Sequence, residues 1–249
     1  MEPGERPFHG PSPPPAALLL SAASLAAAAG LSAGRLWRLP VGPLPLVLTA
    51  STGFLLAAVA AGAWRTARGR LVGLALIGCW AGDLVGQRHF VAGALCFLVA
   101  HLAFSGAFLS AGLRRLATLG WGSAAMVSAA VVLRVFLPAV PAAEVPLVVA
   151  YVVVISVMVV AVGASRAAPA PAVAAAVLFY VSDIFVARWR YGFGGSLNAL
   201  FCYPLYYLAC NLFALAIPSL RRGVDSVGQA PAGADAPPRR APQPPGDHP

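Results

Sequence analysis

Eight long apolar segments are the feature of this sequence that most limits what the chain can fold into. Each is close to the length that a helix needs to cross a bilayer, about 20 residues. Over the whole chain 59% of the residues are hydrophobic and only 10% are charged. The segments are 16–34, 43–64, 71–87, 90–113, 116–137, 145–165, 172–187 and 196–220. The sequence therefore predicts an all-α, polytopic transmembrane helical bundle of about eight helices.

Polar, proline-rich sequence flanks the apolar region on both sides. We expect a disordered N-terminal tail over 1–15, one transmembrane domain over 16–220 and a disordered C-terminal tail over 221–249. The first apolar segment resembles the core of a signal peptide. However, the sequence before it is not basic and the segment is long enough to span, which favours an uncleaved first helix.

The positive charge of the chain comes from arginine alone, since the sequence contains no lysine. The arginines cluster between the apolar segments, so we interpret them as topology signals and expect membrane lipids, not nucleic acid, as partners. More of them follow the second, fourth, sixth and eighth segments than the others, which predicts that both termini are cytoplasmic. Abundant Ala, Gly, Pro and Arg without lysine indicates a GC-rich coding sequence, which favours a bacterial cell membrane.

Acidic residues are scarce in the apolar region. Between Gly10 and Leu220 only Asp83, Glu144 and Asp183 are acidic, and the two aspartates lie inside apolar segments. An ionisable group in the middle of a membrane costs roughly 2.5–3.5 kcal/mol on insertion scales, unless it is paired or functional. Asp83 and Asp183 are therefore the leading candidates for a functional site, whereas we expect Glu144 to be a solvated loop charge.

The third and seventh segments share a short pattern around these aspartates. A small residue precedes the aspartate, and an arginine that ends the segment follows five positions later. The residues are Gly82, Asp83 and Arg88 in one segment and Ser182, Asp183 and Arg188 in the other. At 1.5 Å per residue both carboxyl groups would lie roughly 7–8 Å inside the same membrane face, with His101 roughly 18 Å deep, as the floor of a polar cavity.

Simpler interpretations stand beside this one. A single aspartate can merely pair with the arginine that follows it, and only the matched depth of two aspartates favours function. A histidine inside an apolar segment, such as His101, is more often a hydrogen-bonded interhelical residue than a catalytic one. The tyrosines near the end of the chain are more often an aromatic belt than a binding site, although Tyr203, Tyr207 and Asn211 share one helix face.

Several other chemistries find no support in the sequence. The four cysteines show neither CxxC nor Cys/His ligand spacing, so neither disulfides nor a metal site is predicted. The chain also has no Gly-x-Ser-x-Gly elbow and no HExxH motif. These absences argue against serine esterase and zinc hydrolase mechanisms.

Short motifs surround the aspartates and continue along the later segments. They are Gly82-Asp83, Phe97-Leu98-Val99-Ala100-His101-Leu102-Ala103-Phe104, Leu178-Phe179-Tyr180-Val181-Ser182-Asp183, Asn198, and Tyr207-Leu208-Ala209-Cys210-Asn211-Leu212. Together they resemble the motifs of the YhhN family of membrane proteins, which includes the lysoplasmalogenases, and the resemblance covers the second to eighth segments. The chain departs from the family pattern at Gly42, where lysine is frequent, at Phe104, where tyrosine is common, and at Asn211, which replaces Gln or His.

The resemblance implies a hydrolase that cleaves the vinyl ether bond of a lysophospholipid, a lysoplasmalogen, without a cofactor. It implies Asp83 and Asp183 as acid and base or cation stabiliser, because burial and mutual repulsion let a carboxyl pair hold one protonated and one ionised form at neutral pH. The substrate-binding residues that it implies are His101, Tyr180, Asn198, Tyr207 and Asn211.

Two hypotheses from other classes remain open at this point. A proton-coupled transporter or lipid scramblase could use the same two aspartates to relay protons. A non-catalytic membrane protein would not need two aspartates at matched depth.

Overall fold

The computed structural model describes residues 12–38, 42–192, 195 and 197–221. In this part of the chain helices are joined by short turns and loops, and there is no β-strand. The long helices are Pro15–Leu36 (α1), Pro43–Ala60 (α2), Ala67–Gly86 (α3), Phe90–Leu109 (α4), Arg115–Phe136 (α5), Val145–Ala164 (α6), Ala170–Arg190 (α7) and Leu197–Ala216 (α8). All eight are long and apolar enough to cross a membrane, which confirms the predicted fold class. The two predicted disordered tails lie almost entirely outside the described residues.

Proline and glycine set many of the helix ends. Helices α1, α2, α6 and α7 each have a proline in the first two positions, where the missing N–H has no intrahelical partner to lose. The side chain of Thr66 caps α3 by accepting a hydrogen bond from the Gly69 amide. Past the ends of α2, α4 and α7 the chain turns at Gly62, Gly112 and Gly192, whose φ angles of 84°, 75° and 91° favour glycine.

Arginine does not end the helices in the way that the sequence analysis expected. Helix α3 already includes Arg68 and Arg70 in its first turn, and it ends at Gly86, before Arg88. Helix α7 continues through Arg188 to Arg190. Long arginine side chains at helix ends can reach the polar boundary of the membrane, so they need not lie in a loop.

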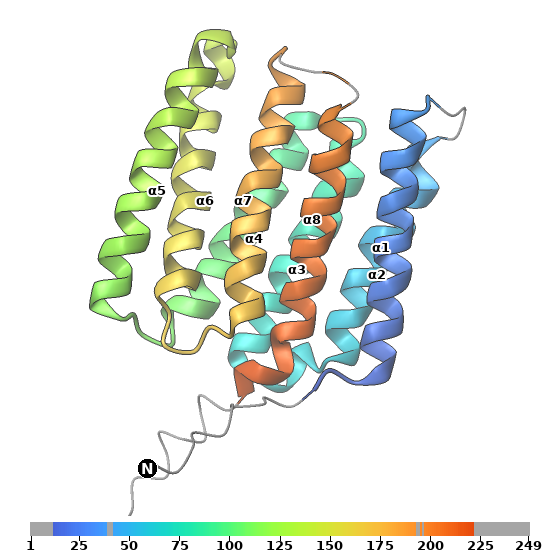
Figure 1. Ribbon diagram of the computed structural model, residues 1–249, viewed down its shortest axis with the longest axis vertical. Helices are drawn as coiled ribbons and strands as arrows, with labels where there is room; N and C mark the ends of the chain where they lie inside the picture. The colour runs from blue at the N-terminus through green and yellow to red at the C-terminus, as the bar shows by residue number, and fades with distance from the viewer. Residues whose placement is uncertain (1–11, 39–41, 193–194, 196, 222–249) are drawn as a thin grey trace, which may run out of the picture.

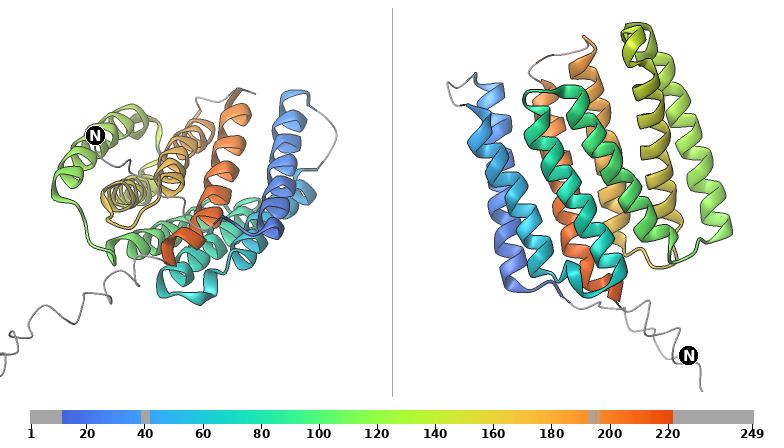
Figure 2. Two further views of the ribbon diagram at one scale, coloured as in Figure 1. Left: turned by 60° about the horizontal axis from the view of Figure 1, so that its bottom comes forward. Right: turned by 180° about the vertical axis from the view of Figure 1, so that it is seen from behind.

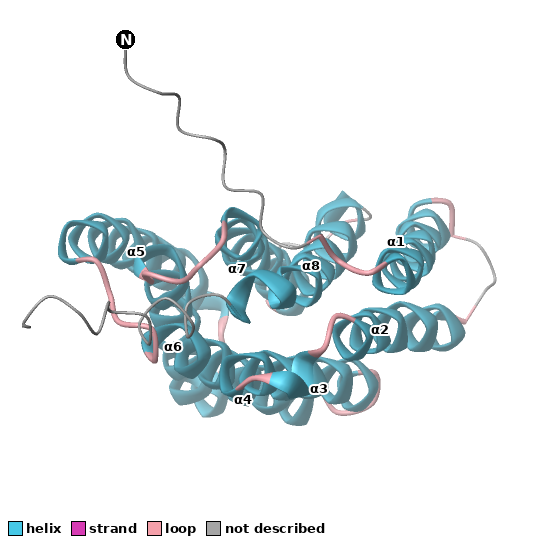
Figure 3. Ribbon diagram, turned by 90° about the horizontal axis from the view of Figure 1, so that it is seen from below, coloured by secondary structure: helices cyan, strands magenta, loops and turns pink. Residues whose placement is uncertain are grey.

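The helices form two layers that enclose the centre of the molecule. Seen along the helices, α7, α8 and α1 lie in one layer and α4, α3 and α2 in the other (Figure 3). Helix α6 closes one end of this arrangement by packing on both α4 and α7, and α1 and α2 close the other end by packing on each other. The described chain begins and ends at the same end of the bundle (Figure 1).

The same packing scheme occurs twice along the chain. Helix α2 packs on α1, α3 and α8, and α6 packs on α5, α7 and α4. In both halves the third and fourth helices form a closely packed hairpin, α3 with α4 and α7 with α8. The first hairpin is seen with α2 in the view from behind (Figure 2). The chain thus contains two copies of a four-helix unit. The short pattern around the aspartates indicated this repeat only in part.

Helix α5 is the exception to this repeat. Its counterpart α1 packs extensively on α8, but comparable packing of α5 on α4 is not found among the described residues. Instead α5 stands outside the bundle against α6 (Figure 1). Much of its apolar surface is exposed, including Leu116, Met126 and Val127, as suits a helix that faces lipid.

Glycines allow the close packing of the α3–α4 hairpin. A Cβ atom on Gly93 would lie 2.6 Å from the Cα of Gly86, so the two backbones meet at this point. One turn earlier on α3, a Cβ on Gly82 would lie 2.7 Å from the ring of Phe97. The glycine that precedes Asp83 therefore makes room for an aromatic ring of the neighbouring helix.

Candidate active site

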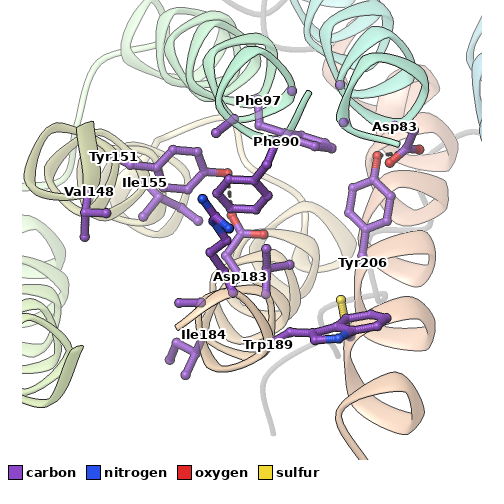
Figure 4. A pocket seen from close by; sticks show the side chains of 18 of the residues that line it. Asp83, Phe90, Phe97, Val148, Tyr151, Ile155, Asp183, Ile184, Trp189 and Tyr206 are labelled. Carbon is purple, nitrogen blue, oxygen red and sulfur yellow. Dashed lines mark hydrogen bonds between the residues drawn. The ribbon is translucent and has the colours of Figure 1, made fainter. Parts of the chain in front are cut away.

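A cavity of about 570 Å³ lies between the two layers, at the end of the bundle where α1, α3, α5 and α7 end. Its walls come from α3 and α4 on one side, α7 and α8 on the other, and α5 and α6 at one end. Exposed residues such as Gln87 and Trp189 line it too, so it reaches the surface. Both Asp83 and Asp183 belong to its lining, and Figure 4 shows them on different sides of it.

Asp83 projects from α3 into a group of hydroxyls. The Oδ2 atom accepts hydrogen bonds from the Ser51 hydroxyl of α2 and from the Tyr206 hydroxyl of α8, the latter at 2.9 Å. Ser51 also lies 3.4 Å from the hydroxyl of Tyr207. The neighbours that hold this carboxyl group are therefore neutral hydroxyls, each of which can donate or accept a hydrogen bond.

Asp183 projects from α7 and has different partners. Tyr151 of α6 donates a hydrogen bond to its Oδ2 atom at 2.8 Å, and Nε2 of His101 lies 3.3 Å from the same oxygen. The histidine nitrogen is also 3.1 Å from the Tyr151 hydroxyl, so the three groups form a compact triangle. His101 is fully buried, whereas Asp183 retains 16% side-chain exposure toward the cavity.

The two carboxyl sites correspond through the internal repeat. Ser51 and Asp83 are 32 residues apart, and so are Tyr151 and Asp183, one hundred positions later in the chain. In each site the second helix of a repeat supplies a hydroxyl and the third supplies the aspartate. The remaining partner comes from the other repeat, because α8 provides the phenol at Asp83 and α4 provides the imidazole at Asp183.

The aspartates are separate sites that share one cavity. Their hydrogen-bond partners in the described part of the chain have no residue in common, and they are hydroxyls and an imidazole, not Arg88 or Arg188. The sequence predicted the two carboxyl groups at the same depth. In the structure the two aspartates lie at different distances from the ends of their helices. Asp83 lies three residues before the end of α3 and Asp183 seven residues before the end of the longer α7.

The structure brings only some of the expected substrate-binding residues to the cavity. Tyr180 and Tyr207 line it. His101 lies behind Asp183 and is not part of the lining, so it is an interhelical, hydrogen-bonded histidine. Tyr180 adds a buried hydroxyl without a hydrogen-bond partner in the described structure, which makes this group available to a ligand.

Asn198 and Asn211 lie outside the cavity lining. The side-chain oxygen of Asn198 accepts a hydrogen bond of 3.4 Å from Arg188, between α7 and the start of α8. Asn211 donates at 2.9 Å to Ser24, which links α8 to α1. Contacts of this kind hold helices together in a membrane, and they do not support a substrate-binding role for either asparagine. Phe104, where tyrosine is common in the family, is also away from the cavity lining and fully buried.

Glu144 lies beside the opening of the cavity and is not the solvated loop charge that we expected. Arg190 donates to its Oε1 atom at 2.6 Å, and Tyr191 donates to its Oε2 atom at 3.0 Å. The pKa of Tyr191 is raised to about 12, mainly by burial and secondly by the hydrogen bond to Glu144. The phenol therefore remains a donor at neutral pH. The cluster ties the segment before α6 to the end of α7.

Three important partners were missed from the sequence. Ser51 and Tyr151 were not considered at all, and Tyr206 was one of the tyrosines near the end of the chain for which an aromatic belt was the more frequent interpretation. Residues with a hydroxyl group are common in membrane helices, so residue type alone does not identify the members of a functional site. The signal that could have found Ser51 and Tyr151 is their equal spacing from the two aspartates.

The geometry defines a class of protein: an integral, multi-pass membrane protein with two carboxyl groups in a cavity between its helices. The model of the YhhN family matches residues 44–217, which include both aspartates and every contact described above for them. The chain belongs to the YhhN family. Neither a curated protein nor a solved structure matches the chain.

Proposed function

We propose that the protein hydrolyses the vinyl ether bond of a lysoplasmalogen to a fatty aldehyde and a glycerophospho-alcohol, without a cofactor. The observation that carries the proposal is the presence of two carboxyl groups in one cavity between membrane helices. A volume of about 570 Å³ is ordinary for a small-molecule site. Membership in a family that includes the lysoplasmalogenases supports the same activity.

The chemistry requires an acid and an anionic group. Protonation of the β-carbon of the vinyl ether creates an oxocarbenium ion, and water then adds to the carbon that bears the ether oxygen. The resulting hemiacetal breaks its bond to the glycerol oxygen, which leaves as the alcohol, and the aldehyde remains. One carboxyl group must supply the proton, while the other stabilises the cation or removes a proton from the water.

The partners of the aspartates favour one assignment of these roles. Asp83 is held by hydroxyls that can donate or accept, so this site can hold a protonated carboxyl group, and we assign it the acid. Asp183 is met by the Tyr151 hydroxyl and by Nε2 of His101, both of which can donate, as a carboxylate requires. His101 then acts as a positioning residue for Asp183.

Purified protein in detergent provides the test. We expect it to release aldehyde from a lysoplasmalogen, and to cleave neither the matching saturated alkyl ether nor the acyl ester at a comparable rate. Only the vinyl ether can be protonated at carbon to give a stabilised cation. In D₂O the aldehyde should carry deuterium on the carbon next to the carbonyl. Equal hydrolysis of the lyso-acyl ester, or aldehyde without deuterium, would contradict the mechanism.

A transporter or lipid scramblase is the second candidate, and the internal repeat around a central acidic cavity is the observation that favours it. Reconstituted vesicles containing a fluorescent, non-cleavable alkyl lysophospholipid distinguish the two candidates. Rapid movement of this lipid between leaflets without any aldehyde release from the vinyl ether would favour transport.

A further inference from the structure

The cavity has an apolar end. Beyond Asp183, on the side away from Asp83, lies α6, whose Val148, Tyr151 and Ile155 are labelled in Figure 4, and α5 adds further lining residues. The apolar residues here are Val132, Phe136, Leu147, Val148, Val152 and Ile155. The Tyr151 hydroxyl at this end is already hydrogen-bonded to Asp183. This end therefore suits a hydrocarbon chain and offers little to a polar ligand.

Only one helix separates this apolar end from the outside of the bundle. Helix α5 does not pack on α4 as its counterpart α1 packs on α8, and it touches α7 over only a short stretch. Its outer face exposes Met126, Val127 and Val131. On this side α5 alone lies between the apolar end and an exposed apolar surface.

Two arginines line the cavity, and they are in different states. Arg190 lies on the α6 side, where it contacts Glu144, whereas Arg35 comes from α1, at the opposite end of the bundle (Figure 3). Arg190 is neutralised by Glu144 at 2.6 Å. Arg35 has no carboxylate partner within the described residues, and its guanidinium lies over the ring of Trp189, 5.2 Å from the centroid. The stacking holds the cation at the cavity, where the Tyr203 phenol is a further neighbour, and the remaining N–H groups can bind an anion.

We propose that the cavity holds a single-chain phospholipid in one orientation, with its phosphate at Arg35 and its aliphatic chain against α5, α6 and α7. This inference rests on the proposed function, because it states how the substrate of that reaction is oriented. In a lysoplasmalogen the phosphate, the glycerol, the vinyl ether and the chain follow one another in that order. The helices that carry Arg35, Asp83, Asp183 and the apolar end, namely α1, α3, α7 and then α6 with α5, follow one another across the bundle in the same order (Figure 3).

The head-group end is tested with Arg35→Gln and two vinyl-ether substrates, a lysoplasmalogen and the neutral 1-alkenyl glycerol that lacks the phosphate. We expect KM for the phospholipid to rise about tenfold or more, because a charge-assisted hydrogen bond is lost, while KM for the neutral lipid stays the same. Arg38→Gln is the matched control, since Arg38 is exposed and outside the lining of this cavity. Equal changes for both substrates would overturn the assignment of Arg35.

The chain end is tested with Val148→Trp, which adds bulk to the cavity wall. The preferred chain length should become shorter by several carbons, with the rate on short chains retained. Val153→Trp on the same helix is the control, because Val153 is 51% exposed and faces outward. If both variants have the wild-type chain-length profile, the aliphatic chain does not lie against α6.

Binding of a saturated 1-alkyl lysophospholipid, measured by native mass spectrometry, separates this inference from the activity. We expect the wild-type protein to bind it, Arg35→Gln to bind it more weakly than Arg38→Gln does, and Val148→Trp to lose long chains selectively. These results without any aldehyde release would refute the hydrolase and keep the orientation. No binding by the wild-type protein, or equal binding by both arginine variants, would refute the orientation.

Discussion

A carboxyl group among apolar helices depends on the few polar side chains that can reach it. Asp83 is reached by Ser51 and Tyr206, and Asp183 by Tyr151 and His101. Each aspartate is therefore best understood together with the hydroxyl that donates a hydrogen bond to it. Each pair can be altered by removing one oxygen or one charge, with little change in volume.

Asp83→Asn and Asp183→Asn should each lower the turnover number by about 10²–10⁴-fold, the usual size of acid–base assistance. Both side chains keep their shape, so the protein should still insert and purify as a monodisperse species. Aldehyde release from a lysoplasmalogen measures the loss, and the melting temperature in detergent is the control. Near-normal turnover in either folded variant would remove that aspartate from the mechanism.

The pH dependence of the residual rates should distinguish the two roles. An acid must be protonated, so the rate falls as the pH rises through its titration. A base must be ionised, so the rate falls as the pH decreases. We expect Asp83→Asn to lose the alkaline decline of kcat and Asp183→Asn to lose the acidic decline. The reverse pattern would exchange the two assignments.

Tyr151→Phe should lower turnover by about 10- to 100-fold, because a hydrogen bond to a charged group is worth about 1.5–3 kcal/mol. The hydroxyl acts through Asp183, so adding Tyr151→Phe to Asp183→Asn should cost little more. Additive losses in the double variant would show that the phenol has a separate role. Turnover of the single and double variants on one substrate measures the coupling.

Sequence reasoning found the charged members of the site but not their neutral partners. Asp83, Asp183 and His101 stand out because ionisable residues are expensive in hydrocarbon. Asn198 and Asn211 were expected at the substrate and instead link helices. Whether an amide faces a cavity or a neighbouring helix depends on packing, which spacing along one segment does not determine.

At the scale of whole helices, hydrophobicity predicted the number and approximate position of the spans. It failed at some of their ends, because we treated Arg70 and Arg188 as loop residues, whereas α3 begins before Arg70 and α7 continues beyond Arg188. Hydrophobicity alone gave no information on which helices pack together. Only the short turn at Arg88 and His89 indicated that the third and fourth segments form a hairpin, as α3 and α4 do. The peripheral position of α5 follows from its contacts and could not be seen in its composition.

The α3–α4 hairpin should be sensitive to any side chain at Gly93. The new Cβ of Gly93→Ala would lie 2.6 Å from backbone, so the helices must separate, and overpacking typically costs about 1–3 kcal/mol. Gly106→Ala on the same helix is the control, since its nearest atom is 3.9 Å away. Thermal unfolding in detergent should show a lower midpoint for the first variant alone. Equal midpoints would mean that the hairpin tolerates this separation.

At the scale of the whole molecule, eight spans place both ends of the described chain on one side of the membrane. The excess of arginine at that side predicts that it is cytoplasmic. Reporter fusions after Arg70 and Arg115 should therefore report a cytoplasmic position. An external signal from both fusions would invert the orientation while keeping the fold.

The internal repeat has a consequence for how two unlike carboxyl groups can arise. Two separate four-helix chains related by a twofold axis would surround their aspartates with identical neighbours, and neither carboxyl group could be the designated proton donor. Within one polypeptide the equivalent positions are free to diverge, and here they carry Ser51 in one half and Tyr151 in the other. Covalent linkage of the halves thus permits a division of labour that a symmetric homodimer could not maintain.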